Sequence, residues 1–217
     1  MKKFITVAGN IGVGKSSLVS RLCQKLKWQP FFEPESNNPY LPDFYKDMHA
    51  WSFHSQIFFL GHRLRVYRDL TDYPDSVILD RSLYEDAEIF AHNLFLNGYM
   101  TRRDYDTYEA LYQSLLAFLP APDLVIYLRA SVATLVERIQ QRNRDYERTI
   151  DTDYLEQLNN SYDTWISGFS LCPVLTIQAD RLDFVSQPNH LEIILNKVQE
   201  KIAGKDEVVF LPGENAP

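Results

Sequence analysis

The sequence predicts an α/β protein whose doubly wound parallel sheet of five strands is flanked by helices. Short, continuously apolar runs alternate with longer amphipathic stretches, and polar motifs follow the ends of those runs. The composition is that of an ordinary globular protein, with 45% hydrophobic and 24% charged residues. A chain of 217 residues with this composition is long enough to bury a sizeable core.

Five apolar runs rich in β-branched and large aliphatic residues are the predicted strands. Continuous rather than alternating apolar runs are typical of parallel strands that helices cover on both faces. In chain order these runs are 4–8, 29–33, 76–80, 124–128 and 173–178, and the run at 29–33 carries the weaker signal.

Amphipathic stretches between and after these runs are the predicted helices. Apolar residues recur in them at helical spacing, as Phe53, Ile57, Leu60 and Leu64 do, and Ser131 is a favourable N-cap. Strands that alternate with helices require right-handed crossovers, and ligands then bind at the carboxyl ends of the strands. The predicted helices are 16–27, 51–70, 82–96, 103–118, 132–141, 153–167 and 189–203.

We predict one domain over residues 1–203 and a C-terminal tail at 204–217. The net charge of −7 argues against a nucleic-acid partner, because such surfaces are usually basic. Cys23 and Cys172 lie far apart, which argues against a disulfide framework. The first apolar run is too short for a signal peptide, and no run approaches the ~20 apolar residues of a membrane span. We therefore expect a cytoplasmic protein without a membrane partner.

The stretch "GNIGVGKS", from Gly9 to Ser16, fits the pattern G-x-x-x-x-G-K-[ST] after a predicted strand and before a predicted helix. In such a P-loop the backbone N–H groups and the positive end of the helix cradle phosphates. We expect Lys15 to reach the β- and γ-phosphates of ATP and Ser16 to ligate Mg²⁺. This indicates the P-loop NTPase type, which GTPases, ATPases and small-molecule kinases share. The predicted nucleotide-binding residues are Gly9, Asn10, Ile11, Gly12, Val13, Gly14, Lys15, Ser16 and Ser17.

Two carboxylates follow predicted strands. Glu33 precedes Pro34, which fixes φ, and Asp80 precedes Arg81, which offers a planar fork of donors. A kinase acting on an alcohol needs a group that accepts the proton and a group that positions the oxygen in line with the γ-phosphate. We expect these residues to supply both, and Asp80 to share Mg²⁺ with the P-loop serine. The alternatives are a surface acid for Glu33 and a helix cap for Asp80.

The stretch 137–148 concentrates positive charge in an acidic chain. It contains Arg138, Arg142, Arg144 and Arg148, and the first two share a helix face. We expect a lid at about 138–150 that neutralises charge on the transferring phosphoryl group and excludes water. The alternative is a solvated helix face.

Together these motifs resemble the deoxynucleoside kinases, which phosphorylate the 5′-hydroxyl of deoxynucleosides with ATP in nucleotide salvage. The resemblance extends from Phe4 to about Phe184. It rests on "GNIGVGKSS", "EP" at 33–34, "NPYLPDFYKD" at 38–47, "WSFHSQ" at 51–56, "DRSLYED" at 80–86 and "ERIQQRNRDYE" at 137–147.

The resemblance implies a role for each matching residue. Glu33 and Arg81 match the residues that bind the 5′-hydroxyl, with Glu33 as proton acceptor and Asp80 as the other candidate. Tyr45 and Glu147 match the pair that holds the 3′-hydroxyl. The matches at the base are Gln56 and Asp86 at its edge, Leu41, Phe44 and Phe90 as apolar walls, and Arg63. The matches on the ATP side are the lid residues Arg138, Arg142 and Arg144, and the adenine loop Leu182, Asp183 and Phe184.

Three departures leave the base open. They are Ala87, where several relatives carry arginine; Glu35, where many carry an apolar residue; and Ser55, where some carry an aromatic one. Likeness to compact bacterial members favours deoxyadenosine or deoxyguanosine, and a pyrimidine or broad specificity is the alternative. A nucleoside monophosphate kinase and a non-catalytic ATP-binding switch are the rival functions. The resemblance also implies a homodimer, and we expect a deoxynucleoside triphosphate to act as feedback inhibitor.

Overall fold

The computed structural model describes residues 2–32, 38–144, 147 and 150–204. Five parallel strands form one sheet in the order β2-β3-β1-β4-β5, which confirms the predicted α/β architecture. The strands are β1 (Phe4–Gly9), β2 (Gln29–Phe31), β3 (Val77–Asp80), β4 (Leu124–Arg129) and β5 (Val174–Gln178).

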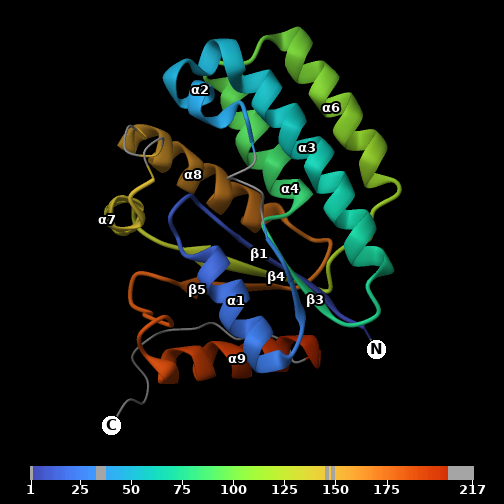
Figure 1. Cartoon of the computed structure of the whole chain (residues 1–217), viewed down its shortest axis with the longest axis vertical. Coiled ribbons are helices and arrows are strands. Elements are labelled where there is room, and N and C mark those ends of the chain that lie inside the picture. The colour runs from blue at the N-terminus through green and yellow to red at the C-terminus, as the bar shows by residue number, and fades with distance from the viewer. Residues whose placement is uncertain (1, 33–37, 145–146, 148–149, 205–217) are drawn as a thin grey trace.

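Helices connect the strands and cover both faces of the sheet (Figure 1). The predicted helical stretches are all present. The short α2 is additional and lies within the motif at 38–47, for which no helix was predicted. The helices are α1 (Lys15–Leu26), α2 (Leu41–Lys46), α3 (Met48–Asp72), α4 (Leu83–Glu85), η2 (Asp86–Ala91), α5 (His92–Leu96), α6 (Arg102–Leu116), α7 (Val132–Arg142), α8 (Thr152–Gly168) and α9 (Pro188–Ile202).

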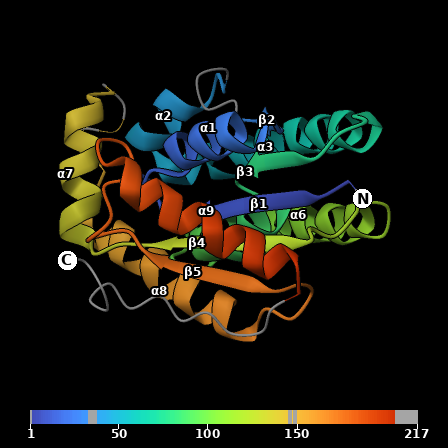
Figure 2. The ribbon, with the colours of Figure 1, turned by 90° about the horizontal axis from the view of Figure 1, so that it is seen from below.

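One face of the sheet packs against α1 and α9 (Figure 2). Ile5, Val7, Ile78 and Ile126 point to this face and are fully buried. Because successive strand residues point to opposite faces, their neighbours in sequence supply the other side. The continuously apolar strands are therefore explained by helices on both faces.

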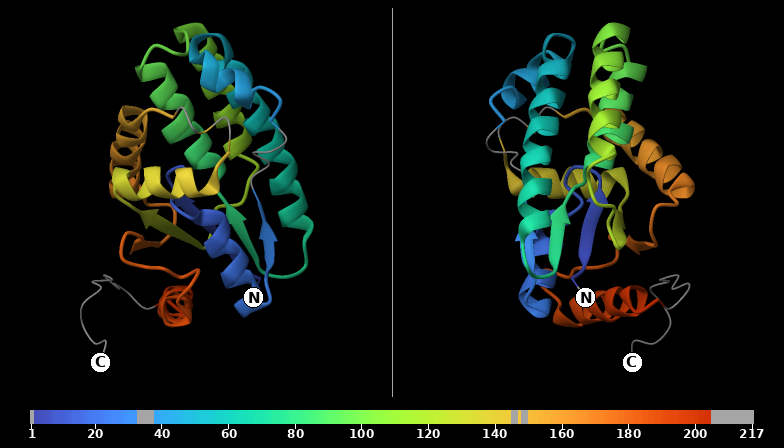
Figure 3. Two further views of the ribbon diagram at one scale, coloured as in Figure 1. Left: turned by 60° about the vertical axis from the view of Figure 1, so that its left-hand side comes forward. Right: turned by 90° about the vertical axis from the view of Figure 1, so that its right-hand side faces the viewer.

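The opposite face is covered by α3, the helical stretch 83–96, α6 and α8. Phe4, Val77 and Leu79 point to it and pack with the buried rings of Tyr67 and Tyr108. α3 and α6 lie side by side and extend beyond the sheet (Figure 3). This extension leaves room for a pocket between the helices and the carboxyl edge of the sheet.

The helical stretch 83–96 is interrupted by a π-helical segment, η2. α4 begins at a capping box, in which the backbone N–H of Ser82 donates to the Glu85 carboxylate. The π-helical turns follow at once and carry Asp86 and Phe90. Such segments are frequent at functional sites because the wider turn redirects side chains.

No helix among the described residues has both the length and the apolar character that crossing a membrane requires.

Candidate active site

The P-loop lies at the carboxyl end of β1 and is closely packed. Gly9 has φ +147°, and a Cβ atom there would lie 2.6 Å from the carbonyl oxygen of Leu128. A Cβ at Gly12, whose φ is +80°, would lie 2.7 Å from Ile139 of α7. Both positions therefore require glycine for conformation and for space. The loop is enclosed between β4 and α7.

Lys15 and Ser16 begin α1, where the helix N-terminus offers N–H groups to an anion. The ammonium group of Lys15 is buried and donates to the backbone oxygen of Asn10 at 3.1 Å. The Ser16 hydroxyl donates to a carboxylate oxygen of Asp80 at 2.5 Å. The sheet thus brings together the serine and the aspartate that were predicted as Mg²⁺ ligands, because β1 and β3 are adjacent.

The turn after β3 presents Arg81. Its φ of +65° is left-handed, a conformation that costs a non-glycine residue free energy and persists where the surroundings enforce it. Its backbone N–H donates to the oxygen of Val7, and its guanidinium lies 4.3 Å from the centre of the Phe90 ring. The side chain is 4% exposed. The predicted catalytic arginine is therefore held at the edge of the P-loop strand.

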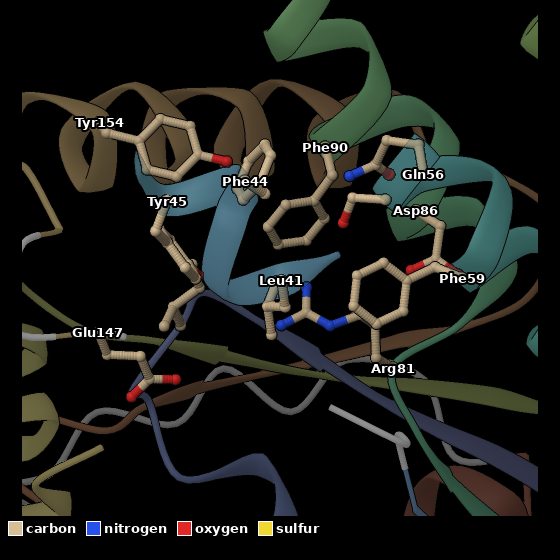
Figure 4. Close-up of a pocket in the computed structure, with 12 residues that line it drawn as sticks. Leu41, Phe44, Tyr45, Gln56, Phe59, Arg81, Asp86, Phe90, Glu147 and Tyr154 are labelled. Atoms are coloured by element: carbon tan, nitrogen blue, oxygen red, sulfur yellow. The ribbon is translucent and has the colours of Figure 1, made fainter. Parts of the chain in front are cut away.

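A pocket with an empty volume of about 540 Å³ lies above this edge, between α2, α3, η2 and α8 (Figure 4). The lining residues are Ile11, Leu41, Phe44, Tyr45, Ser55, Gln56, Phe59, Arg81, Asp86, Phe90, Glu147 and Tyr154.

The polar groups of this pocket gather at two ends. Gln56 and Asp86 lie beside Phe90 at one end, and Tyr45 and Glu147 lie at the other (Figure 4). The pocket therefore juxtaposes the residues predicted for the base and those predicted for the sugar. Among the described residues, the Gln56 amide makes no hydrogen bond, so its donor and acceptor are open to a ligand.

Arg63 differs from its predicted place. It is 1% exposed and lies behind Asp86, with Nε and Nη2 donating to the two carboxylate oxygens at 2.9 and 3.2 Å. Its Nη1 also donates to the backbone oxygen of Arg81 at 2.5 Å. Arg63 is therefore no part of the pocket wall. Its long side chain reaches from α3 beneath the turn, where it neutralises Asp86 and supports the strained backbone.

The lid arginines fall into two groups. Arg142 makes a bidentate ion pair with Glu147 at 2.6 Å, and Arg144 lies 3.4 Å from the same carboxylate. Arg138 instead donates to the backbone oxygens of Val13 and Ala179, both at 2.8 Å. Arg138 thus ties α7 to the P-loop, whereas Arg142 and Arg144 pair with a carboxylate that lines the pocket.

A second, larger cleft follows the outer side of the P-loop and contains most residues predicted for ATP. Asn10 and Ile11 lie elsewhere: the Asn10 amide donates to Leu155 and Asn159 of α8, and Ile11 lines the first pocket. Gly9 and Val13 are buried in the loop itself. The cleft is lined by Gly12, Gly14, Lys15, Ser16, Ser17, Thr134, Glu137, Arg138, Gln141, Arg142, Arg144, Asp180, Leu182, Asp183, Phe184, Val185 and Ser186.

Some predicted residues lie outside the described part of the chain, namely Glu33, Glu35 and Arg148. Conversely, no motif pointed to Phe59 and Tyr154, which line the pocket. Tyr154 is 6% exposed, and burial raises the pKa of its phenol, so that it stays a neutral hydrogen-bonding group. In sequence, both rings read as ordinary apolar positions of amphipathic helices, and only packing assigns them to the pocket.

A P-loop on a parallel sheet, an adjoining pocket and a cluster of arginines are typical of a phosphotransferase. The family model for deoxynucleoside kinases matches residues 5–203, and the chain belongs to that family. The kinase assignment made from the sequence motifs is thereby confirmed.

Relatives and solved structures agree with this assignment. The chain is 38% identical to the deoxyadenosine/deoxycytidine kinase of Bacillus subtilis (strain 168), over 91% of this chain and 92% of the relative. It is 35% identical to the deoxyguanosine kinase of the same organism, over 92% and 97%. A structure of deoxyadenosine kinase from M. mycoides with bound dATP has a TM-score of 0.81 at 31% identity and covers 91% of this chain and 99% of that one.

Proposed function

We propose that the chain transfers the γ-phosphate of ATP to the 5′-hydroxyl of a purine deoxynucleoside, with deoxyadenosine preferred. The observation that carries this is the charge of the pocket beside the P-loop. Among the described lining residues, Asp86 and Glu147 are carboxylates and Arg81 is the one cation. An acceptor that already bears a phosphate would meet too little positive charge there, which disfavours the monophosphate-kinase alternative.

The residues around the P-loop have complementary roles in this proposal. Lys15 and the lid at 138–150 neutralise the triphosphate, and Arg81 positions the 5′-oxygen and the transferring group. Glu33 accepts the hydroxyl proton. Removing such a base costs about 10²–10⁴-fold in rate.

Mg²⁺ suits the residues at the mouth of α1. The Ser16 hydroxyl and the Asp80 carboxylate lie within hydrogen-bond distance, and both are the hard oxygen ligands that this ion prefers. The described residues contain no group of three His, Cys, Asp or Glu side chains placed for a metal, and Mg²⁺ typically takes few protein ligands. When bound, the ion supplies charge neutralisation at the β- and γ-phosphates.

The polar end of the pocket favours adenine. The Gln56 amide can pair with an amino group beside a ring nitrogen, and the carboxylate of Asp86 lies next to it. Guanine places a carbonyl oxygen where adenine has the amino group, which would face the carboxylate. Cytosine shares the amino edge but fills less of the pocket. A bidentate amide–base contact is worth about 1–3 kcal/mol, or roughly 5- to 150-fold in discrimination.

The test is a kinase assay with Mg-ATP and each of the four deoxynucleosides and dTMP. We expect deoxyadenosine to give the highest kcat/KM, Glu33→Gln to lower kcat by about 100-fold or more, and Asp80→Asn to shift the Mg²⁺ dependence. Glu156→Gln, on the exposed side of α8, is the matched control and should behave as wild type. Turnover of dTMP alone would overturn the proposal. ATP binding without turnover of any of these acceptors would favour the switch.

Three further properties belong to the same proposal. Exposed Leu96 and Leu111 on α5 and α6, and exposed Phe118 just after α6, support a homodimer. Ile11 and Arg81 join the P-loop side to the first pocket, which supports feedback inhibition by a deoxynucleoside triphosphate that spans both sites. The cytoplasmic location stays a prediction.

A further inference from the structure

Glu85 is a fully buried carboxylate beside the P-loop that the mechanism above does not use. One of its oxygens accepts from the backbone N–H of Gly9 at 3.1 Å and from the Tyr162 hydroxyl at 2.8 Å. The other accepts from the backbone N–H and the hydroxyl of Ser82 at 2.8 and 3.2 Å. The side chain is 0% exposed. A carboxylate so buried is stable only with compensating partners, and these partners belong to the P-loop, to the turn that carries Arg81 and to α8.

Tyr162 of α8 links this carboxylate to Arg81. Its phenol oxygen accepts from Nη1 of Arg81 at 2.9 Å and donates its proton to Glu85. The guanidinium is 3.9 Å from the Glu85 carboxylate itself. The tyrosine is also 0% exposed, and its ring stacks on Tyr127 at a centroid distance of 5.7 Å. The phenol is therefore fixed by packing, so its hydroxyl lies in one place.

We propose that Tyr162 and Glu85 are positioning residues, which hold the guanidinium of Arg81 at the reacting oxygen and tie it to the first residue of the P-loop. This inference rests on the proposed role of Arg81. The Phe90 ring lies against the guanidinium at 4.3 Å, and the phenol hydrogen-bonds it. An arginine side chain has many rotamers, and contacts of both kinds restrict it to the orientation needed in the transition state. Because Glu85 also accepts from the backbone N–H of Gly9, it holds Arg81 and the P-loop in a fixed position relative to each other.

Tyr162→Phe is the central test, because it removes one hydroxyl and keeps the ring. We expect kcat to fall 10- to 100-fold, with KM for ATP and for the nucleoside within threefold of wild type. Tyr127→Phe is the matched control, because its ring stacks on Tyr162. The hydroxyl that this change removes donates to Asp163 and does not contact the arginine. We expect this control to stay within twofold of wild type.

Glu85→Gln tests the link to the P-loop. Each carboxylate oxygen accepts from donors, so an amide of the same shape must turn its NH₂ group toward one of these pairs. We expect kcat to fall at least as far as in Tyr162→Phe. We also expect KM for ATP to rise, because the backbone N–H of Gly9 loses its acceptor or the side chain at position 85 shifts away from it.

A double-mutant cycle separates positioning from a general structural effect. In the background of Arg81→Lys, Tyr162→Phe should change kcat by less than twofold, since its effect acts through the guanidinium. The inference is overturned if Tyr162→Phe alone is within twofold of wild type, or if it costs the same factor in both backgrounds. If Arg81→Lys itself keeps the wild-type kcat, the proposed role of Arg81 fails, whatever the tyrosine variant does.

Discussion

At the scale of single residues, Gly9 shows how little space separates the P-loop from the neighbouring strand β4. Gly9 ends β1 with a left-handed φ, and its missing side chain is what lets β4 approach. An L-residue with a side chain meets two independent penalties here, from backbone strain and from overlap with the backbone of Leu128. The requirement for glycine at this position therefore comes both from the conformation of the P-loop and from the close approach of β4.

Gly9→Ala should lower the free energy of unfolding by roughly 2–6 kcal/mol, because strain and steric overlap each cost about 1–3 kcal/mol. Chemical denaturation monitored by circular dichroism measures this. Gly61→Ala is the matched control: no atom lies within 4 Å of the added Cβ, and the residue is exposed in the middle of α3. It should stabilise the chain by up to about 1 kcal/mol. Equal stability of the two alanine variants would contradict this account.

At the scale of elements, α7 carries the first lid arginines and packs against the P-loop. Its N-cap Ser131 accepts from the backbone N–H of Thr134, and Ser131 also donates to Asp180 of the donor cleft at 2.8 Å. Further along, Ile139 covers Gly12 and Arg138 binds the P-loop backbone. We therefore expect a change at the first turn of α7 to affect the position of the P-loop.

Ser131→Ala should cost about 1 kcal/mol of stability through the lost cap and raise KM for ATP about two- to fivefold, because α7 sits less firmly on the P-loop. Thr101→Ala removes an equivalent cap from α6, where Thr101 accepts from the backbone N–H of Asp104. It should cost the same stability and leave KM for ATP unchanged. Thermal unfolding and initial-rate kinetics on both variants decide; equal KM values would show that α7 does not transmit the change.

The elements also show what could be predicted from the sequence. Apolar runs and helical spacing were sufficient for strands and helices, because burial on both faces of the sheet leaves a strong pattern. The π-helical turns at 86–91 were not predicted, because six residues are too few for their wider spacing to stand out in the helical pattern of the stretch. For the site, the motif residues predicted for the base and the sugar line the two ends of one pocket, and their roles stay predictions. Tyr162, Glu85 and the rear position of Arg63 depend on contacts between distant segments, which spacing along the chain does not reveal.

At the scale of the whole molecule, the helical layer above the sheet is rich in buried phenols. Burial raises the pKa of Tyr67, Tyr108, Tyr112, Tyr127 and Tyr154 above the usual value. Above pH ~10 the unfolded chain loses these protons while the folded chain keeps them, so the unfolded state binds fewer protons and stability falls as pH rises.

The free energy of unfolding should therefore decrease above pH ~10 by about 1.4 kcal/mol per pH unit for each such tyrosine. Thermal melts between pH 8 and 11, with phenolate absorbance followed in parallel, test this. The denatured chain is the control and should titrate all 13 tyrosines near pH 10. If the folded chain titrated them all in that same range, the phenols would not be protected.

The net charge of −7 repels an approaching anion at long range, and the lid offsets little of this repulsion, because Glu147 already compensates part of the charge of Arg142 and Arg144. In the proposed reaction the triphosphate competes with Glu147 for these two guanidinium groups. Small inorganic anions have fewer contacts with which to compete, whereas a nucleotide adds those of its base and sugar. We therefore expect this ion pair to make the arginines more selective for a nucleotide than for inorganic phosphate.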